Sequence, residues 1–208
     1  MKTILCFGDS NTWGYIPGTG QRHPLKKRWP GVAGNILGTD FHFIEEGLNG
    51  RTTVMEDPTR PGRNGLPYFG PCLTSHAPLD LVVLMLGTND CKHRFNLSAF
   101  DISEGMAMLV GLAKASSSGP GGKPPLVLVV SPATIGLLSD KVDLFAGAEE
   151  KAQGLARHFA AVAQAHACGF FDASKVCQTS PVDGIHLDEA GQQALGRALA
   201  EKIRAMLG

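Results

Sequence analysis

The 208-residue sequence has no long hydrophobic run and no excess of charge of either sign. No stretch approaches the roughly 18 apolar residues of a membrane-spanning helix. Lysine plus arginine number 19, as do aspartate plus glutamate, and this balance creates no long-range positive field for a phosphate backbone. We therefore expect neither a membrane nor a nucleic acid as partner. Near-zero net charge also gives little repulsion between copies, which favours a homo-oligomer.

Cysteine is too scarce and too scattered to form a disulfide framework. The five cysteines are odd in number and include no Cys-x-x-Cys pair, as expected of reduced thiols. The N-terminal segment lacks the apolar region and cleavage site of a signal peptide, so a cytoplasmic protein is predicted. No histidine pair has metal-binding spacing, and no glycine-rich nucleotide motif is complete. We expect no metal ion and no cofactor.

Short apolar runs alternate with amphipathic stretches along the chain. Two of the runs are apolar on both alternating faces, which is typical of central parallel strands covered by helices on both sides. Hydrophobic residues three and four positions apart predict helices around 102–113, 155–163 and 195–206, and a further helix over Pro30–Leu37 ends at Gly38. The predicted strands are Thr3–Phe7, His42–Glu45, Leu79–Leu86, Leu126–Val130 and Gly169–Phe171.

This alternation predicts an α/β fold of three layers. A doubly wound, flavodoxin-like parallel sheet of about five strands would carry helices on both faces. Two segments rich in glycine, proline and polar residues, Gly47–Pro71 and Ser116–Pro125, are predicted to be irregular. The strand pattern resumes directly after the second segment and no internal repeat occurs. We therefore predict a single domain over residues 1–208.

Four polar, glycine-containing turns follow predicted strands or precede the last helix. They read GDSNTWG at 8–14, GLNGRTT at 47–53, GTND at 87–90 and DGIH at 183–186. Taken singly, each turn is also typical of an ordinary loop or helix cap. Ligands of parallel sheets bind beyond the carboxyl ends of the strands. The ordered set therefore indicates one site at that edge of the sheet.

The residue types in these turns are those that acyl transfer requires. Such a site needs a nucleophile, a base, a group that orients the base, and donors to the developing oxyanion. Ser10 offers a hydroxyl, His186 an imidazole, and Asp183 a carboxylate that can bond to the other imidazole nitrogen. Donors to the oxyanion can come from the backbone N–H groups of Ser10 and Gly50 and from the side-chain amide of Asn89.

The four turns resemble those of the SGNH (GDSL-type) hydrolases, a family named for serine, glycine, asparagine and histidine in turns of this kind. Asn11 stands where the family commonly has leucine. Flanking residues such as Glu45–Leu48 resemble more narrowly the bacterial arylesterase/acyltransferase branch, whose members are oligomeric and act on short acyl esters. The resemblance implies that Ser10 is the nucleophile, His186 the base and Asp183 its orienting group, with Ser10, Gly50 and Asn89 forming the oxyanion hole.

The expected function is therefore that of a serine esterase. It would hydrolyse short-acyl carboxylic esters, aryl esters among them, through an acyl-enzyme, with acyl transfer to alcohols as a further activity. A carbohydrate O-deacetylase and a non-catalytic module that binds an ester or sugar are the alternatives. Trp13, three residues after Ser10, is predicted to form a wall of the acyl pocket, with a core position as the alternative. Arg51 could hold a carboxylate or sugar, or form a structural salt bridge.

Overall fold

The computed structural model describes residues 1–208 and centres on one five-stranded sheet. The strands lie in the order β2-β1-β3-β4-β5, and all neighbouring strands are parallel. The predicted parallel sheet is confirmed, with β2 longer and β3 shorter than the sequence pattern indicates. The bounds are β1 (Lys2–Gly8), β2 (Phe41–Gly47), β3 (Leu81–Met85), β4 (Leu126–Ser131) and β5 (Gly169–Asp172).

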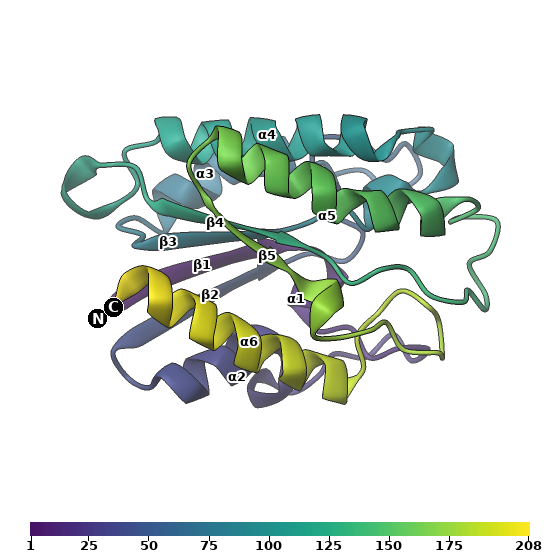
Figure 1. Ribbon diagram of the computed structural model, residues 1–208, viewed down its shortest axis with the longest axis horizontal. Helices are drawn as coiled ribbons and strands as arrows, with labels where there is room; N and C mark the ends of the chain where they lie inside the picture. Colours follow the sequence, from purple (N-terminus) through teal and green to yellow (C-terminus); the bar gives the residue numbers. More distant parts are fainter.

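Helices cover both faces of this sheet (Figure 1). One face packs against α3, α4 and α5, and the other against α2 and α6. No helix combines the length and the apolar character needed to cross a membrane. The bounds are α1 (Ser10–Trp13), α2 (Trp29–Leu37), α3 (Gly65–Ser75), α4 (Ala99–Ala115), α5 (Ala148–Ala165) and α6 (Glu189–Leu207).

Alternating side chains of the central strands enter two separate cores. On β1, Leu5 and Phe7 pack with α3, α4 and α5, whereas Ile4 and Cys6 pack with α2 and α6. All four side chains are completely buried. A strand that is buried on both faces needs apolar residues at every position, which is why these runs do not alternate with polar residues.

The segment Gly47–Pro71 was predicted to be irregular, and this prediction is wrong for its last residues, where α3 begins at Gly65. Asn64 caps the helix by accepting a hydrogen bond from the backbone N–H of Leu66 at 3.0 Å. Proline and glycine inside the helix disfavour it locally. Its buried side chains, Phe69 among them, pack in the core that the sheet shares with α4 and α5. Tertiary packing therefore overrides the local propensity.

Two glycines allow α1 to sit directly on the carboxyl ends of β1 and β2. A Cβ added to Gly8 would lie 2.1 Å from Oγ1 of Thr12 and 2.9 Å from the carbonyl oxygen of Met85. A Cβ added to Gly47 would lie 2.2 Å from the backbone nitrogen of Trp13. The contact at Gly47 is with backbone, which cannot move aside without displacing α1.

We expect Gly47→Ala to lower the free energy of unfolding by more than ~2 kcal/mol, because the added methyl group clashes with the backbone of α1. The matched control is Gly111→Ala in α4, where an added Cβ meets nothing within 4 Å. That change should raise stability by about 0.5–1 kcal/mol, because alanine loses less conformational entropy in a helix. Urea unfolding of both variants measures the difference. Wild-type stability of Gly47→Ala would contradict the close packing of α1 on β2.

Candidate active site

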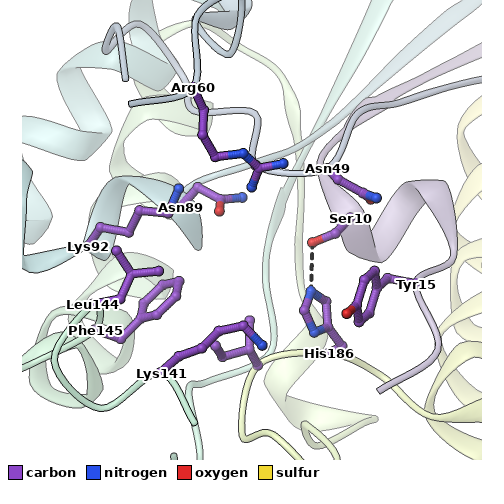
Figure 2. Close-up of a pocket in the computed structure, with 12 residues that line it drawn as sticks. Ser10, Tyr15, Asn49, Arg60, Asn89, Lys92, Lys141, Leu144, Phe145 and His186 are labelled. Atoms are coloured by element: carbon purple, nitrogen blue, oxygen red, sulfur yellow. Dashed lines mark hydrogen bonds between the residues drawn. The ribbon is translucent and has the colours of Figure 1, made fainter. Parts of the chain in front are cut away.

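A cavity of about 250 Å³ opens beyond the carboxyl ends of the strands, and it brings together residues far apart in the sequence. Ser10, Gly50, Asn89 and His186 all line it, and they come from the four turns singled out above. Figure 2 shows Ser10 and His186 facing one another on one side of this cavity, with Asn89 across from them.

Ser10 is the first residue of the short helix α1. The side chain of Asp9 caps this helix by accepting a hydrogen bond from the backbone N–H of Asn11 at 2.9 Å. The helix ends at Gly14, whose φ of 87° is in the left-handed region that glycine tolerates best. This abrupt strand-to-helix turn leaves the Ser10 hydroxyl on the cavity wall, with the residue only 5% exposed.

Asp183, His186 and Ser10 form a continuous chain of hydrogen bonds. Nε2 of His186 lies 3.0 Å from Oγ of Ser10, and Nδ1 of His186 lies 2.7 Å from Oδ2 of Asp183. The other carboxylate oxygen of Asp183 accepts hydrogen bonds from the backbone N–H groups of Ile185 and His186. With Nδ1–H donated to Asp183, the lone pair of Nε2 faces the serine hydroxyl, so the imidazole can take up its proton.

The environment of Asp183 keeps its carboxyl ionised. Burial alone would raise its pKa, but the hydrogen bonds from His186 and Ile185 lower the pKa to about 2. The group is therefore a carboxylate throughout the neutral range. Such a carboxylate holds the imidazole in one tautomer and stabilises the imidazolium that forms when the serine loses its proton.

Asn89 lies across the cavity from the imidazole, and Gly50 lines the same cavity. One proton of the Asn89 amide goes to the carbonyl oxygen of Arg51 at 3.1 Å, which leaves the second proton free. Gly50 adopts a φ of 86°. The neighbouring Asp90 fixes this region, because its carboxylate accepts hydrogen bonds from Thr53 N–H at 2.9 Å and Thr53 Oγ1 at 2.6 Å. Burial raises the pKa of Asp90 to about 6.

Trp13, expected to be a wall of the acyl pocket, is not among the residues that line the cavity. Tyr15 lines it instead, and its ring stacks on the imidazole of His186 with centroids 4.1 Å apart. Trp13 faces the guanidinium of Arg22, which lies 5.0 Å from its ring centroid. No sequence pattern indicated Tyr15, because it follows the left-handed turn at Gly14 that ends α1, outside any regular element.

Arg51 is a structural residue and does not line the cavity. Its guanidinium donates hydrogen bonds to the carbonyl oxygens of Gly8, at 2.9 Å, and Glu46. It also lies over the ring of Phe7, 4.1 Å from the centroid. Arg51 therefore ties the ends of β1 and β2 together from inside. The sequence left open whether Arg51 binds a ligand or has a structural role. The geometry fits the structural role, although the partners of Arg51 are two carbonyl groups and an aromatic ring and not the expected salt bridge.

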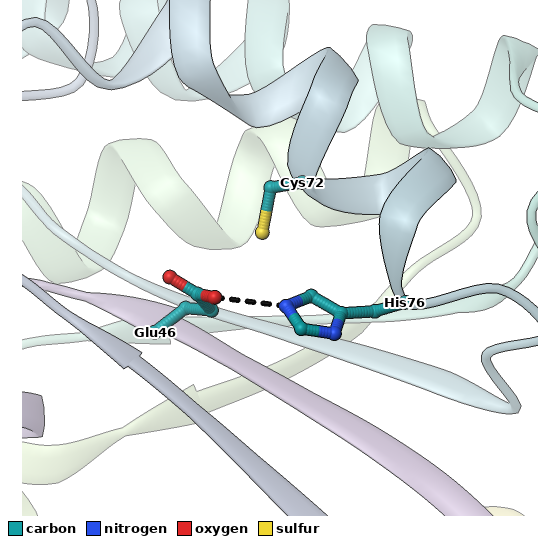
Figure 3. Close-up of side chains that lie close together, drawn as sticks. All are labelled: Glu46, Cys72 and His76. Atoms are coloured by element: carbon teal, nitrogen blue, oxygen red, sulfur yellow. Dashed lines mark hydrogen bonds and ion pairs between the residues drawn. The ribbon is translucent and has the colours of Figure 1, made fainter.

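One cluster of potential metal ligands lies outside the cavity, formed by Glu46, Cys72 and His76 (Figure 3). Their ligand atoms lie within 4.8 Å of one another, and Nε2 of His76 is 2.8 Å from Oε1 of Glu46. The sequence did not predict this cluster, because Glu46 comes from β2 whereas Cys72 and His76 come from α3 and its C-terminal cap. Burial and the nearby Glu46 raise the pKa of the Cys72 thiol to about 12. Without a metal ion the thiol is protonated at neutral pH, and His76 and Glu46 form a hydrogen-bonded pair beside it.

Comparisons with known proteins show the family of the chain. The model of the GDSL-like lipase/acylhydrolase family matches residues 6–194. The chain belongs to this family. No curated protein sequence matches the chain. Together with the structures described next, the family match confirms the resemblance inferred from the four turns.

Two solved structures are similar over the full length of both chains. One is an aryl esterase of M. smegmatis, with 46% sequence identity, 100% coverage of each chain and a TM-score of 0.96. The other is Est24, a carbohydrate acetylesterase from Sinorhizobium meliloti, with 40% identity, 100% coverage of each chain and a TM-score of 0.96. The chain is a carboxylic ester hydrolase of the SGNH type. The alternative of a non-catalytic binding module is therefore set aside.

Asn11, the position where this esterase departs from the family's common leucine, joins the two parts of the site. Its amide nitrogen donates to the carbonyl oxygen of Ile185 at 3.3 Å, and its amide oxygen accepts from the N–H of Leu187 at 2.9 Å. These two residues flank His186. The backbone oxygen of Asn11 accepts a further bond from the side chain of Gln192. A polar residue at this position therefore fixes the histidine segment against α1.

We expect Asn11→Leu to lower the free energy of unfolding by about 2–4 kcal/mol. The reason is that it leaves a buried carbonyl group and a buried N–H group without partners. The esterase activity should fall as well, since the histidine segment loses its attachment to α1. Urea unfolding and turnover of an aryl acetate measure the two effects. The control Asn35→Ala removes an exposed amide on α2 and should change neither. Unchanged stability and turnover in Asn11→Leu would show that apolar packing alone positions His186.

Proposed function

We propose that this esterase is a serine hydrolase that cleaves short-acyl carboxylic esters, aryl esters among them, through an acyl-enzyme on Ser10. The observation that carries the proposal is the hydrogen-bonded chain from Asp183 through His186 to Ser10, which ends in a small cavity beside Asn89 and Gly50. Such a chain supplies a nucleophile, its base and the group that orients the base.

In the acylation step, Oγ of Ser10 attacks the carbonyl carbon while Nε2 of His186 accepts the hydroxyl proton. The carbonyl oxygen then carries a negative charge, which the Asn89 amide and the N–H groups of Ser10 and Gly50 stabilise. When this intermediate collapses, the bond to the alcohol oxygen breaks. The imidazolium gives its proton to the leaving alkoxide, and the acyl group stays on Ser10.

In the deacylation step, a water molecule or an alcohol repeats the sequence. Nε2 of His186 takes a proton from the attacking oxygen, which bonds to the acyl carbon. Collapse of the second intermediate returns the proton to Ser10 and releases an acid or a new ester. The rings of Tyr15 and Phe145 line the cavity. An apolar lining of this kind disfavours water relative to an alcohol, which supports acyl transfer to alcohols as a second outcome of the same step.

The size of the cavity supports a short acyl group. At about 250 Å³ it lies below the roughly 300–1,000 Å³ typical of sites for larger ligands. Leu144, Phe145 and Ile185 form its apolar lining together with the ring of Tyr15. An acetyl to butyryl chain can be enclosed there, whereas a long chain would have to extend into solvent.

A carbohydrate O-deacetylase is the second candidate, and Asn49 favours it. The side-chain oxygen of Asn49 is buried, has no hydrogen-bond partner in the protein, and belongs to a residue that lines the cavity. A sugar hydroxyl could donate to it. A comparison of an O-acetylated sugar with phenyl acetate tests this candidate. Asn49→Ala should lower kcat/KM for the sugar ester more than for phenyl acetate if the sugar hydroxyl binds there.

We expect Ser10→Ala to abolish ester hydrolysis, with a loss on the order of 10⁶ in kcat, because no other nucleophile lies beside His186. A fluorophosphonate probe should label the wild-type protein and leave the variant unlabelled, since the probe needs an activated serine. Thermal unfolding should confirm that the variant stays folded. Wild-type turnover or labelling of Ser10→Ala would exclude Ser10 as the nucleophile.

We expect Asn89→Ala to lower kcat by roughly 10²–10³ with a smaller change in KM. The amide stabilises the charge that develops on the carbonyl oxygen, and this charge is present mainly in the transition state. Steady-state kinetics on phenyl acetate separates the two parameters. A rise in KM at constant kcat would instead make Asn89 a residue that binds the ground state.

A further inference from the structure

The cavity wall carries three cationic side chains and no carboxylate. Arg60, Lys92 and Lys141 all line it together with Ser10 and His186, whereas no aspartate or glutamate does. The chain as a whole has a formal net charge of zero. Positive charge therefore exceeds negative charge on the cavity wall, although the two balance over the whole chain. A cleft lined by charges of one sign attracts ligands of the opposite sign.

Only part of this charge is neutralised by neighbouring carboxylates. Nζ of Lys92 lies 3.3 Å from Oδ2 of Asp57, and both side chains are almost completely buried. Asp57 also accepts a hydrogen bond from Arg94, so one carboxylate serves two cations. Lys92 is thus a fixed structural group, and burial together with the charges of Arg60 and Arg94 lowers its pKa despite the pairing with Asp57.

Arg60 and Lys141 are the two cations that remain available to a ligand. Arg60 takes part in no ion pair, whereas the ion pairs of this region join Lys92 and Arg94 to Asp57. The carboxylate partner of Lys141 is Asp140, whose side chain is 70% exposed and 3.4 Å away. Pairs between such exposed groups contribute little, so a ligand can displace this one.

The positions of both groups are close to the reacting atoms. A Cβ added to Gly50 would lie 2.9 Å from Nη1 of Arg60, so the guanidinium stands directly beside the proposed oxyanion hole. Figure 2 shows the Arg60 side chain extending over the cavity towards Asn49 and Ser10, and Lys141 running along the opposite edge towards His186. An anionic group on the alcohol side or the acyl side of a bound ester could reach one of these cations.

We propose that this site selects esters that carry a carboxylate near the ester bond, with Arg60 and Lys141 binding that anionic group. This inference rests on the proposed serine esterase function and names a substrate class for it. The planar guanidinium of Arg60 suits a carboxylate because it can donate two parallel hydrogen bonds. Lys141 supplies a second charge, on a flexible side chain, on the other side of the cavity.

The experiment uses matched pairs of esters that differ only in charge. For the alcohol side of the ester, 4-acetoxybenzoate is compared with 4-acetoxybenzamide. For the acyl side, monoethyl succinate is compared with ethyl succinamate. In each pair a neutral amide replaces the carboxylate with nearly the same shape. We expect kcat/KM to be about tenfold higher for the charged ester in at least one pair, and the preference should shrink at high salt as the charges are screened.

Two variants and one control assign the preference to residues. Arg60→Gln and Lys141→Gln should each lower the ratio of kcat/KM between charged and neutral esters by about three- to tenfold. Arg157→Gln removes the same charge from an exposed position on α5, away from the cavity, and should leave the ratio unchanged. An equal fall of the ratio in Arg157→Gln would mean that net charge acts at long range, which would overturn the proposal.

The remaining outcomes separate this inference from the proposed function. Equal kcat/KM for charged and neutral esters in both pairs, with turnover that depends on Ser10, would overturn the anionic preference alone. An Arg60→Gln variant that lowers kcat equally for both members of a pair would make Arg60 a donor to the oxyanion instead. Absence of Ser10-dependent turnover with any of the four esters would overturn the proposed function and the preference together.

Discussion

The carboxamide of Asn11 holds together two segments that lie at opposite ends of the chain. Its hydrogen bonds to Ile185 and Leu187 set His186 against α1, so that an imidazole and a hydroxyl 176 positions apart in sequence come within 3.0 Å. A parallel sheet makes this possible, because every strand ends at the same edge and delivers its turn there. The sheet brings the two segments to one edge, and a few buried hydrogen bonds then set the position of His186 relative to Ser10.

The placement has an electrostatic cost in the buried carboxylates beneath the site. Burial raises the pKa of both Asp9 and Asp90 from 3.8 to about 6. An acid whose folded-state pKa is raised binds its proton more tightly in the folded protein. The two groups therefore destabilise the fold above about pH 6, and this destabilisation disappears as the pH falls from about 6 to about 4. Asp9 nevertheless caps α1, and Asp90 anchors Thr53 beside Asn89. Local order at the site is maintained at some expense of stability at neutral pH.

The sequence predicted the sheet and the four turns because these depend on hydrophobic runs and on glycines at strand ends. The prediction was wrong at α3, because proline and glycine disfavour a helix that buried contacts nevertheless stabilise. It also placed Trp13 where Tyr15 stands, because the turn at Gly14 decides which side chain faces the imidazole. Arg60 and Lys141 lie in loops whose path no periodicity records, so their approach to the cavity becomes visible only in three dimensions.

The central claim is that Ser10 carries the acyl group between two half-reactions. Mass spectrometry of the protein, quenched with acid shortly after mixing with excess phenyl acetate, tests this claim most directly. We expect a population heavier by one acetyl group, with the added mass confined to the peptide that contains Ser10 and lost again when turnover is complete. An acetyl group found on another residue, or hydrolysis with no acylated protein under conditions where deacylation is slower than acylation, would contradict it.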